Sequence, residues 1–163
     1  MFIAKKGKDP VDCASYRPIS LLNTDAKILA KVLALRLDEA LPHNIHWSNR
    51  FYQEPTFVFL NVLYTPSHDQ IPECIVSIDA AKAFDRIEWN YLFSVLNKYG
   101  FGPMFTGWIK LLYTATTAMV RTDGIISQPF RLGRGMLQGC PLSPILFDMA
   151  IEPLAIAFRD KTF

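Results

Sequence analysis

Residues 74–86 have the sequence CIVSIDAAKAFDR, in which a β-prone run is followed by an aspartate and small residues. The run from Cys74 to Ile78 is short, apolar and rich in β-branched residues, which predicts a strand. Asp79 follows at the carboxyl end of this strand, and small residues come after it. A carboxylate on a rigid strand end leaves room for a divalent cation and for phosphates that approach the backbone. Taken by itself, such an aspartate is more often a turn or capping residue.

Helical patterns flank this stretch. One helix is predicted from Asn23 or Thr24, either of which can cap it, to Pro42, which should end it. We expect its apolar residues, which recur at helical spacing, to face the core: Ile28, Leu29, Val32, Leu33, Leu35 and Leu37. The spacing of Asp85 and Glu88 predicts a capping box at the start of a second helix, and Gly100 should end it. The residues of this helix that should face inward are Tyr91, Leu92, Val95, Leu96 and Tyr99.

A third helix should run from about Pro103 to Tyr113. After it, Asp123-Gly124 lies between two β-prone runs, residues 116–122 and 125–132, and predicts an antiparallel hairpin because both turn positions tolerate positive φ. Ser143 can cap a last helix that continues to Phe158, with Pro144 in its first turn and a kink at Pro153. Residues 45–72 lack sustained periodicity, apart from a short helix near 57–63. The predicted fold class is α+β.

Composition limits the class of protein. The 163 residues are 50% hydrophobic and carry a formal net charge of +2, which indicates one packed domain or a piece of a larger one. The three cysteines are odd in number and widely spaced, which excludes a disulfide framework and favours a reducing intracellular compartment, nuclear or cytoplasmic. Their spacing from the histidines matches no pattern of zinc ligands. No apolar run reaches the roughly 20 residues of a bilayer span, so no membrane association is expected. The charge alone does not indicate nucleic acid.

The loop at residues 133–141, GRGMLQGCP, is rich in glycine. It differs from a dinucleotide-binding loop, because its third glycine comes one residue late and a hairpin rather than a parallel strand precedes it. Without further context it is a flexible loop before a capped helix.

Five blocks of sequence occur in a fixed order: KKGKDP at 5–10, SYRPISLLN at 15–23, DAKILAK at 25–31, SIDAAKAFDR at 77–86 and QGCPLSP at 138–144. Together they resemble the reverse transcriptase domain of non-LTR, LINE-type retrotransposons. The resemblance implies part of a right-hand polymerase, with a fingers-like segment at 1–73 and a partial palm at 74–163. It also implies an RNA template, a DNA primer and a deoxynucleoside triphosphate as partners, and Mg²⁺ as cofactor.

The resemblance gives roles to individual residues. Asp79 matches the first metal-binding, catalytic aspartate. Phe84 matches the bulky residue beneath the incoming sugar, where an aromatic ring excludes a 2′ hydroxyl; the alternative is an ordinary core phenylalanine. Gln138 and Gly139 match the loop that packs on the incoming nucleotide and its template base. Arg17 matches a fingers arginine near template or triphosphate, although a surface arginine that braces the loop before Pro18 is an equal alternative.

Departures from the family pattern are equally informative. The family continues past this point to an Ala-Asp-Asp hairpin and a thumb, whereas the sequence ends at Phe163. An Asp-Gln-x-Gly-Phe segment is absent near residues 46–47, which indicates an internal deletion in the fingers. Met136 and Leu137 replace the usual Thr-Arg. We therefore expect a reverse transcriptase fragment that is inactive alone. The alternatives are a non-catalytic nucleic-acid-binding or protein-binding remnant and a decayed product without function.

Overall fold

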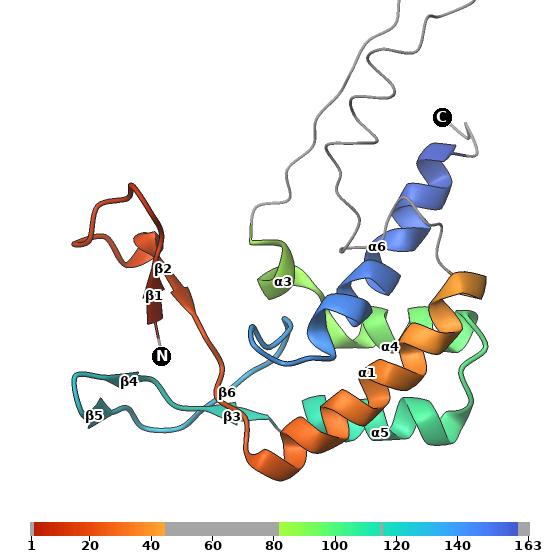
Figure 1. Ribbon diagram of the computed structural model, residues 1–163, viewed down its shortest axis with the longest axis horizontal. Coiled ribbons are helices and arrows are strands. Elements are labelled where there is room, and N and C mark those ends of the chain that lie inside the picture. The colour runs from red at the N-terminus through yellow and green to blue at the C-terminus, as the bar shows by residue number, and fades with distance from the viewer. Residues whose placement is uncertain (1, 45–81, 115, 160–163) are drawn as a thin grey trace, which may run out of the picture.

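A computed structural model describes residues 2–44, 82–114 and 116–159 (Figure 1). Helices and short antiparallel strands are mixed, which confirms the α+β class. The strand predicted at 74–78, the helix near 57–63 and Asp79 lie outside the described residues. In chain order the elements are β1 (Phe2–Ala4), a 3-10 turn (Cys13–Ser15), β2 (Tyr16–Pro18), α1 (Thr24–Asn44), α3 (Ala83–Arg86), α4 (Trp89–Lys98), α5 (Pro103–Tyr113), β3 (Thr117–Ala118), β4 (Arg121–Thr122), β5 (Ile125–Ile126), β6 (Phe130–Arg131) and α6 (Ser143–Arg159).

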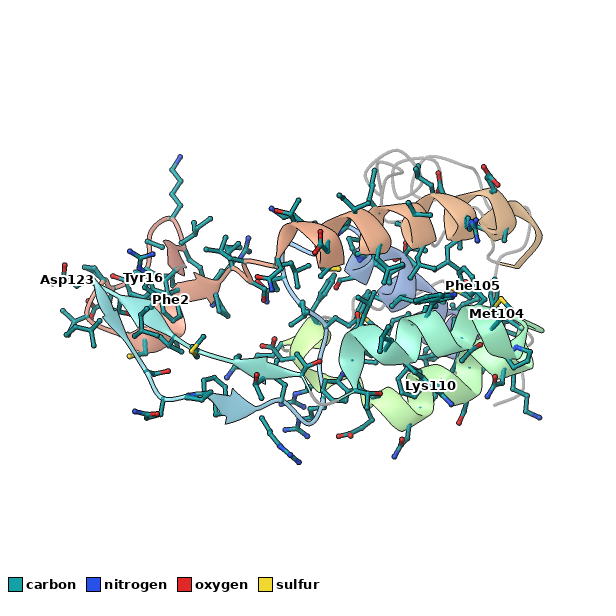
Figure 2. The ribbon with its side chains drawn as sticks, turned by 90° about the horizontal axis from the view of Figure 1, so that it is seen from below. Phe2, Tyr16, Met104, Phe105, Lys110 and Asp123 are labelled. Atoms are coloured by element: carbon teal, nitrogen blue, oxygen red, sulfur yellow. The ribbon has the colours of Figure 1, made fainter. Side chains whose placement is uncertain are left out.

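Helices α1, α4, α5 and α6 pack into a helical body (Figure 1). Each contributes large side chains to one core, and each fully buried aliphatic or aromatic side chain there stabilises the fold by about 1.5–3 kcal/mol. The two hairpins, β1–β2 and β3–β6, lie together at the other end of the molecule in both Figure 1 and Figure 2. The largest fully buried apolar side chains of the body are Leu37, Leu92, Leu96, Ile109, Tyr113, Leu142, Leu146 and Met149.

Helix α1 differs from its prediction in which face is buried. Leu33 and Leu37 are buried as expected, but Ile28, Val32 and Leu35 are 59%, 42% and 52% exposed. The buried face is instead made of residues at i, i+3, i+4, i+7 and i+11, because small alanines let α1 approach α5 and α6 closely: Ala30, Leu33, Ala34, Leu37 and Leu41. The prediction that Pro42 ends the helix is wrong, because the helix continues to Asn44.

The capping box predicted at Asp85 and Glu88 is wrong. Asp85 lies inside the single turn α3, and Glu88 precedes α4 without a side-chain capping bond. The chain breaks at Ile87 because the loop before α6 bonds to it: the Gly135 N–H donates to the Ile87 carbonyl at 2.8 Å. Tertiary hydrogen bonds therefore override the local capping preference.

Helix α4 ends at Lys98, and the predicted terminator Gly100 follows two residues later with a φ of 81°. The Gly100 and Phe101 N–H groups donate to the carbonyls of Asn97 and Leu96, which is the Schellman pattern that glycine permits. Leu92, Val95 and Leu96 are buried as expected, and Tyr99 is partly buried against the core. The inward position expected for Tyr91 is wrong, because this side chain is 44% exposed. The Tyr91 hydroxyl donates to the Ala150 carbonyl of α6 at 2.8 Å and so joins two helices.

The predicted hairpin is confirmed around Asp123-Gly124, whose φ angles of 47° and 78° are both positive. Strand β4 pairs with β5 next to the turn, and β3 pairs with β6 further out. The two ladders differ by one residue in register, so the strand that contains Pro129 carries a bulge between them. Proline lacks the N–H that a regular ladder would require there.

Helix α6 runs from Ser143 to Arg159 and contains Pro153 without interruption. Ser143 does not cap it, since the residue already belongs to the helix and its buried hydroxyl has no hydrogen-bond partner among the described residues. The kink expected at Pro153 stays a prediction. No helix in the described ranges combines the length and apolarity of a membrane span.

Candidate functional site

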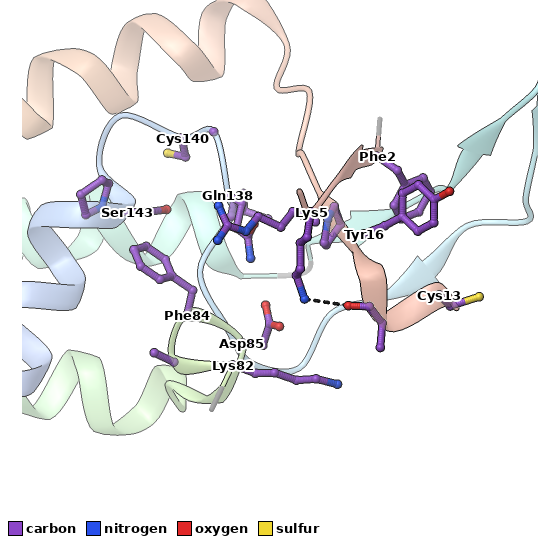
Figure 3. A pocket seen from close by; sticks show the side chains of 17 residues that line it. Phe2, Lys5, Cys13, Tyr16, Lys82, Phe84, Asp85, Gln138, Cys140 and Ser143 are labelled. Atoms are coloured by element: carbon purple, nitrogen blue, oxygen red, sulfur yellow. Dashed lines mark hydrogen bonds between the residues drawn. The ribbon is translucent and has the colours of Figure 1, made fainter. Parts of the chain in front are cut away.

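A cavity of about 870 Å³ lies between the β1–β2 hairpin, α3 and the loop that precedes α6 (Figure 3). Four of the five residues singled out from the sequence line it: Arg17, Phe84, Gln138 and Gly139. They come from three segments that are far apart in the chain. The fifth, Asp79, lies outside the described residues.

The wall formed by Gln138 and Gly139 is fixed to the N-terminal segment. The Ser20 N–H donates to the Gln138 carbonyl at 2.7 Å. Gly139 has a φ of 100°, and a Cβ added there would lie 3.1 Å from the Ser20 carbonyl oxygen. Only glycine combines this backbone conformation with so close an approach. The loop is therefore held against the chain that leads from Arg17 into α1.

The same loop is also fixed to α3 on the opposite side. Gly135 has a φ of 88°, and a Cβ there would lie 3.2 Å from the Asp85 backbone. The Met136 N–H donates to the Phe84 carbonyl at 2.7 Å, and the Trp89 Nε1–H donates to the Gly135 carbonyl at 2.8 Å. Two glycines thus let one loop contact two separate segments.

Phe84 is half-buried and lines the cavity. Its ring is stacked on that of Phe147 in α6, with 4.7 Å between the centroids and 9° between the planes. The side chain therefore packs against the helical body and borders the cavity at the same time.

Among the described residues, three cations border the cavity, Lys5, Arg17 and Lys82, against one carboxylate, Asp85. The Lys5 ammonium donates to the Ala14 carbonyl at 2.7 Å, drawn as the dashed line in Figure 3, which holds it at the rim. The backbone of Lys82 adopts the left-handed conformation, with a φ of 53°. This excess of positive charge favours an anionic ligand such as a phosphate.

Two buried residues with hydroxyl groups, Ser143 and Tyr113, belong to this region, and Ser143 is one of the residues that line the cavity. Ser143 is only 1% exposed, and Tyr113 belongs to the core. Burial raises the pKa of Tyr113 far above its ordinary value, because the charged phenolate would lose its hydration there. Tyr113 is therefore neutral at any physiological pH and acts as a packing residue.

The described residues alone do not form a metal site. Among them no group of three His, Cys, Asp or Glu side chains could hold an ion. The described lining of the cavity contains a single carboxylate, Asp85, whereas Mg²⁺ bound by protein and phosphate usually takes one or two carboxylates.

Sequence reasoning missed several residues that the cavity brings together. Lys5 and Lys82 are only members of matching blocks, and the sequence pattern of Asp85 indicates a helix cap. Phe147 lies outside the cavity lining but contacts it through Phe84, and no sequence motif assigns it a role. A signal for Phe147 exists, since it follows Ser143 by four residues on a predicted helix and so shares its face. No local pattern could have indicated that Lys82 adopts a positive φ.

Comparisons with known proteins give a consistent result. The family described as "Reverse transcriptase (RNA-dependent DNA polymerase)" matches residues 3–162. The chain is 34% identical over 181 residues to the "Transposon TX1 uncharacterized 149 kDa protein" of Xenopus laevis, covering 96% of this chain and 14% of the relative. It is 31% identical over 166 residues to the "Retrovirus-related Pol polyprotein from type-2 retrotransposable element R2DM" of Drosophila melanogaster, covering 94% and 15%. The chain thus spans about a seventh of the length of these relatives.

Proposed function

Because this chain belongs to the reverse transcriptase (RNA-dependent DNA polymerase) family, we propose that it forms the nucleotide-facing part of an RNA-directed DNA polymerase. One observation carries the proposal: a single cavity is lined by Arg17, Phe84, Gln138 and Gly139, which come from three of the five blocks that resemble the family. Its ligands would be an RNA template paired with a DNA primer, and a deoxynucleoside triphosphate.

The chemistry of the lining residues supports this assignment. Arg17 is exposed, and its planar guanidinium can donate two parallel hydrogen bonds to the oxygens of one phosphate. Lys5 and Lys82 add charge at the same rim. Gln138 offers an amide donor and acceptor to a base pair, and Gly139 lets the backbone approach it closely. The Phe84 ring would lie beneath the sugar and exclude a 2′ hydroxyl.

The family uses a divalent metal, and we propose Mg²⁺ held by Asp79. When bound, the ion would neutralise charge that develops on the transferred phosphoryl group. Within the 163 residues of this chain, only Asp79 matches a metal-binding aspartate of the family, so we expect no primer extension by these residues alone. Extension by the purified chain on an RNA template, abolished by Asp79→Ala, would overturn this expectation.

We further propose that residues 1–73 are a fingers-like segment with an internal deletion near 46–47, and residues 74–163 a partial palm. The match to the Xenopus laevis relative extends over 181 residues, more than the 163 residues of this chain, so the relative has residues that this chain lacks within the matched region.

The test is ligand binding by the full 163-residue chain. Isothermal titration should detect dGTP, and fluorescence anisotropy should detect a labelled DNA primer on an RNA template. Gln138→Ala should weaken binding of both ligands by about tenfold, as expected when one well-placed hydrogen-bonding side chain is lost. Gln128→Ala, a change on the hairpin outside the cavity, is the matched control and should leave both affinities unchanged.

Two other results would select the alternatives. Binding of primer–template without any binding of dGTP would indicate a non-catalytic nucleic-acid-binding protein. A chain with no cooperative unfolding transition and no near-UV circular dichroism would indicate a decayed product.

A further inference from the structure

Phe84 belongs to a very short element, and that element cannot fix the ring by itself. Helix α3 is a single turn of four residues, and no side-chain hydrogen bond caps its start. One helical turn is unstable in isolation because its nucleation cost exceeds the gain from its few hydrogen bonds. The position of the Phe84 ring is therefore determined by contacts from other elements.

Such contacts come from Met136 and Phe147, and they act on different parts of the residue. The Met136 N–H holds the Phe84 carbonyl at 2.7 Å, which fixes the backbone. The stacked ring of Phe147, 4.7 Å away between centroids, fixes the side chain. Aromatic pairs in such offset or parallel arrangements couple more strongly than their buried area alone predicts.

Phe147 is itself attached to a rigid support. It lies in the 17-residue helix α6, between the fully buried Leu146 and the buried Asp148. A displacement of the Phe147 ring would require movement of the helix or a change of rotamer within a packed core. Helix α6 therefore provides a fixed reference surface for the Phe84 ring.

We propose that Phe147 is a positioning residue for sugar selection: its ring sets how closely the Phe84 ring approaches the 2′ position of a nucleotide in the cavity. This inference rests on the proposed function, since it requires Phe84 to lie beneath the sugar. A small displacement of Phe84 would open space for a hydroxyl group. When two ligands differ by one small group, the steric fit of a binding site can change the ratio of their affinities by about tenfold or more.

The experiment compares the dissociation constants of dGTP and GTP, measured by isothermal titration on the full chain. Wild type should favour dGTP. Phe147→Leu should reduce the ratio of the GTP constant to the dGTP constant by about tenfold, mainly through tighter GTP binding. Phe147→Tyr retains the ring and should retain the ratio. Phe147→Met, which fills a similar volume without a ring, replaces Phe147→Leu if the latter does not fold.

The chain offers a matched control in a second stacked pair. The rings of Phe101 and Phe105 lie 5.3 Å apart at 27° and do not line the cavity. Phe105→Leu removes a comparable stack, so a general loss of stability would appear there too while the ratio stayed unchanged. If Phe147→Leu kept the wild-type ratio of the GTP and dGTP constants, the role of Phe147 would be overturned and the proposed function would stand. Failure of wild type to bind nucleotide, or equal binding of dGTP and GTP, would overturn the proposed role of Phe84 and the inference with it.

Discussion

The main-chain N–H of Ser20 donates a 2.7 Å hydrogen bond to the carbonyl oxygen of Gln138. This bond joins the segment that leads into α1 to the loop that leads into α6, and the cavity lies beside it. Gly139 follows directly and packs against the Ser20 carbonyl of the same segment. The two sides of the candidate site are thus connected through backbone rather than through side chains.

Gly139→Ala should lower the free energy of unfolding by about 1–3 kcal/mol, because a positive φ of 100° is strained for alanine and its Cβ would crowd the Ser20 carbonyl. Urea denaturation measures the change. Gly133→Ala is the control within the same loop, since nothing lies within 4 Å of a Cβ there and its φ is not positive. Equal effects of the two substitutions would contradict the close contact.

Trp89→Phe should destabilise the fold by about 1–2 kcal/mol, because it removes the Nε1–H donor and leaves the Gly135 carbonyl without that bond. The chemical denaturation midpoint gives this value. Trp108→Phe serves as comparison, because the Trp108 side chain is 47% exposed on α5 and should tolerate the change. If Trp89→Phe were neutral, the loop would not depend on this bond.

Arg17→Ala should weaken binding of a primer–template duplex and reduce the slope of log affinity against log salt by about one, as expected for one lost phosphate contact. Fluorescence anisotropy at several KCl concentrations gives the slope. Arg36→Ala removes the same charge from the exposed surface of α1, away from the cavity, and should leave the slope at its wild-type value. An unchanged slope in Arg17→Ala would favour its role as a surface brace.

Tyr113 should make the fold sensitive to alkaline pH. Burial raises its pKa in the folded state, whereas the unfolded value is about 10. Above pH 10 the unfolded state releases the phenolic proton and the folded state retains it, so stability falls as pH rises, by up to about 1.4 kcal/mol per pH unit.

Tyr113→Phe should remove the part of the loss of stability above pH 10 that Tyr113 causes. At pH 7 it should remain within about 1 kcal/mol of wild type, since the Tyr113 hydroxyl has no hydrogen-bond partner among the described residues. Urea midpoints at pH 8 and pH 11 test both statements. A parallel loss of stability in the two proteins between these pH values would show that other groups cause it.

Elements governed by local rules could be predicted from sequence. The α4 terminus at Gly100 and the turn at Asp123-Gly124 depend on residues that tolerate positive φ, and both were found where predicted. The mistakes arise from tertiary contacts. Asp85 and Glu88 have a capping-box pattern, but the Gly135 and Met136 N–H groups bond to the same stretch and divide it. Apolar residues lie on two faces of α1, and only packing against α5 and α6 decides that Ala30 and Ala34 face inward.

The candidate site likewise contains residues that the sequence could identify and partners that it could not. Phe84, Gln138, Gly139 and Arg17 could be named because they lie in blocks that resemble a family, and the structure brings them to one cavity. Their partners could not be named, because the stack on Phe147 and the left-handed backbone of Lys82 depend on how separate segments meet.

The loop at residues 133–141 contacts its neighbours mainly through peptide groups at Gly135, Met136 and Gln138. These hydrogen bonds do not depend on side-chain identity at Leu137 and Gln138, both of which line the cavity. The side chains of Met136 and Cys140 are different, because they are buried in the core beside the helical body. The loop therefore separates two tasks: its peptide groups, two glycines and two core side chains hold its shape, and Leu137 and Gln138 are left to determine the chemistry of the cavity wall.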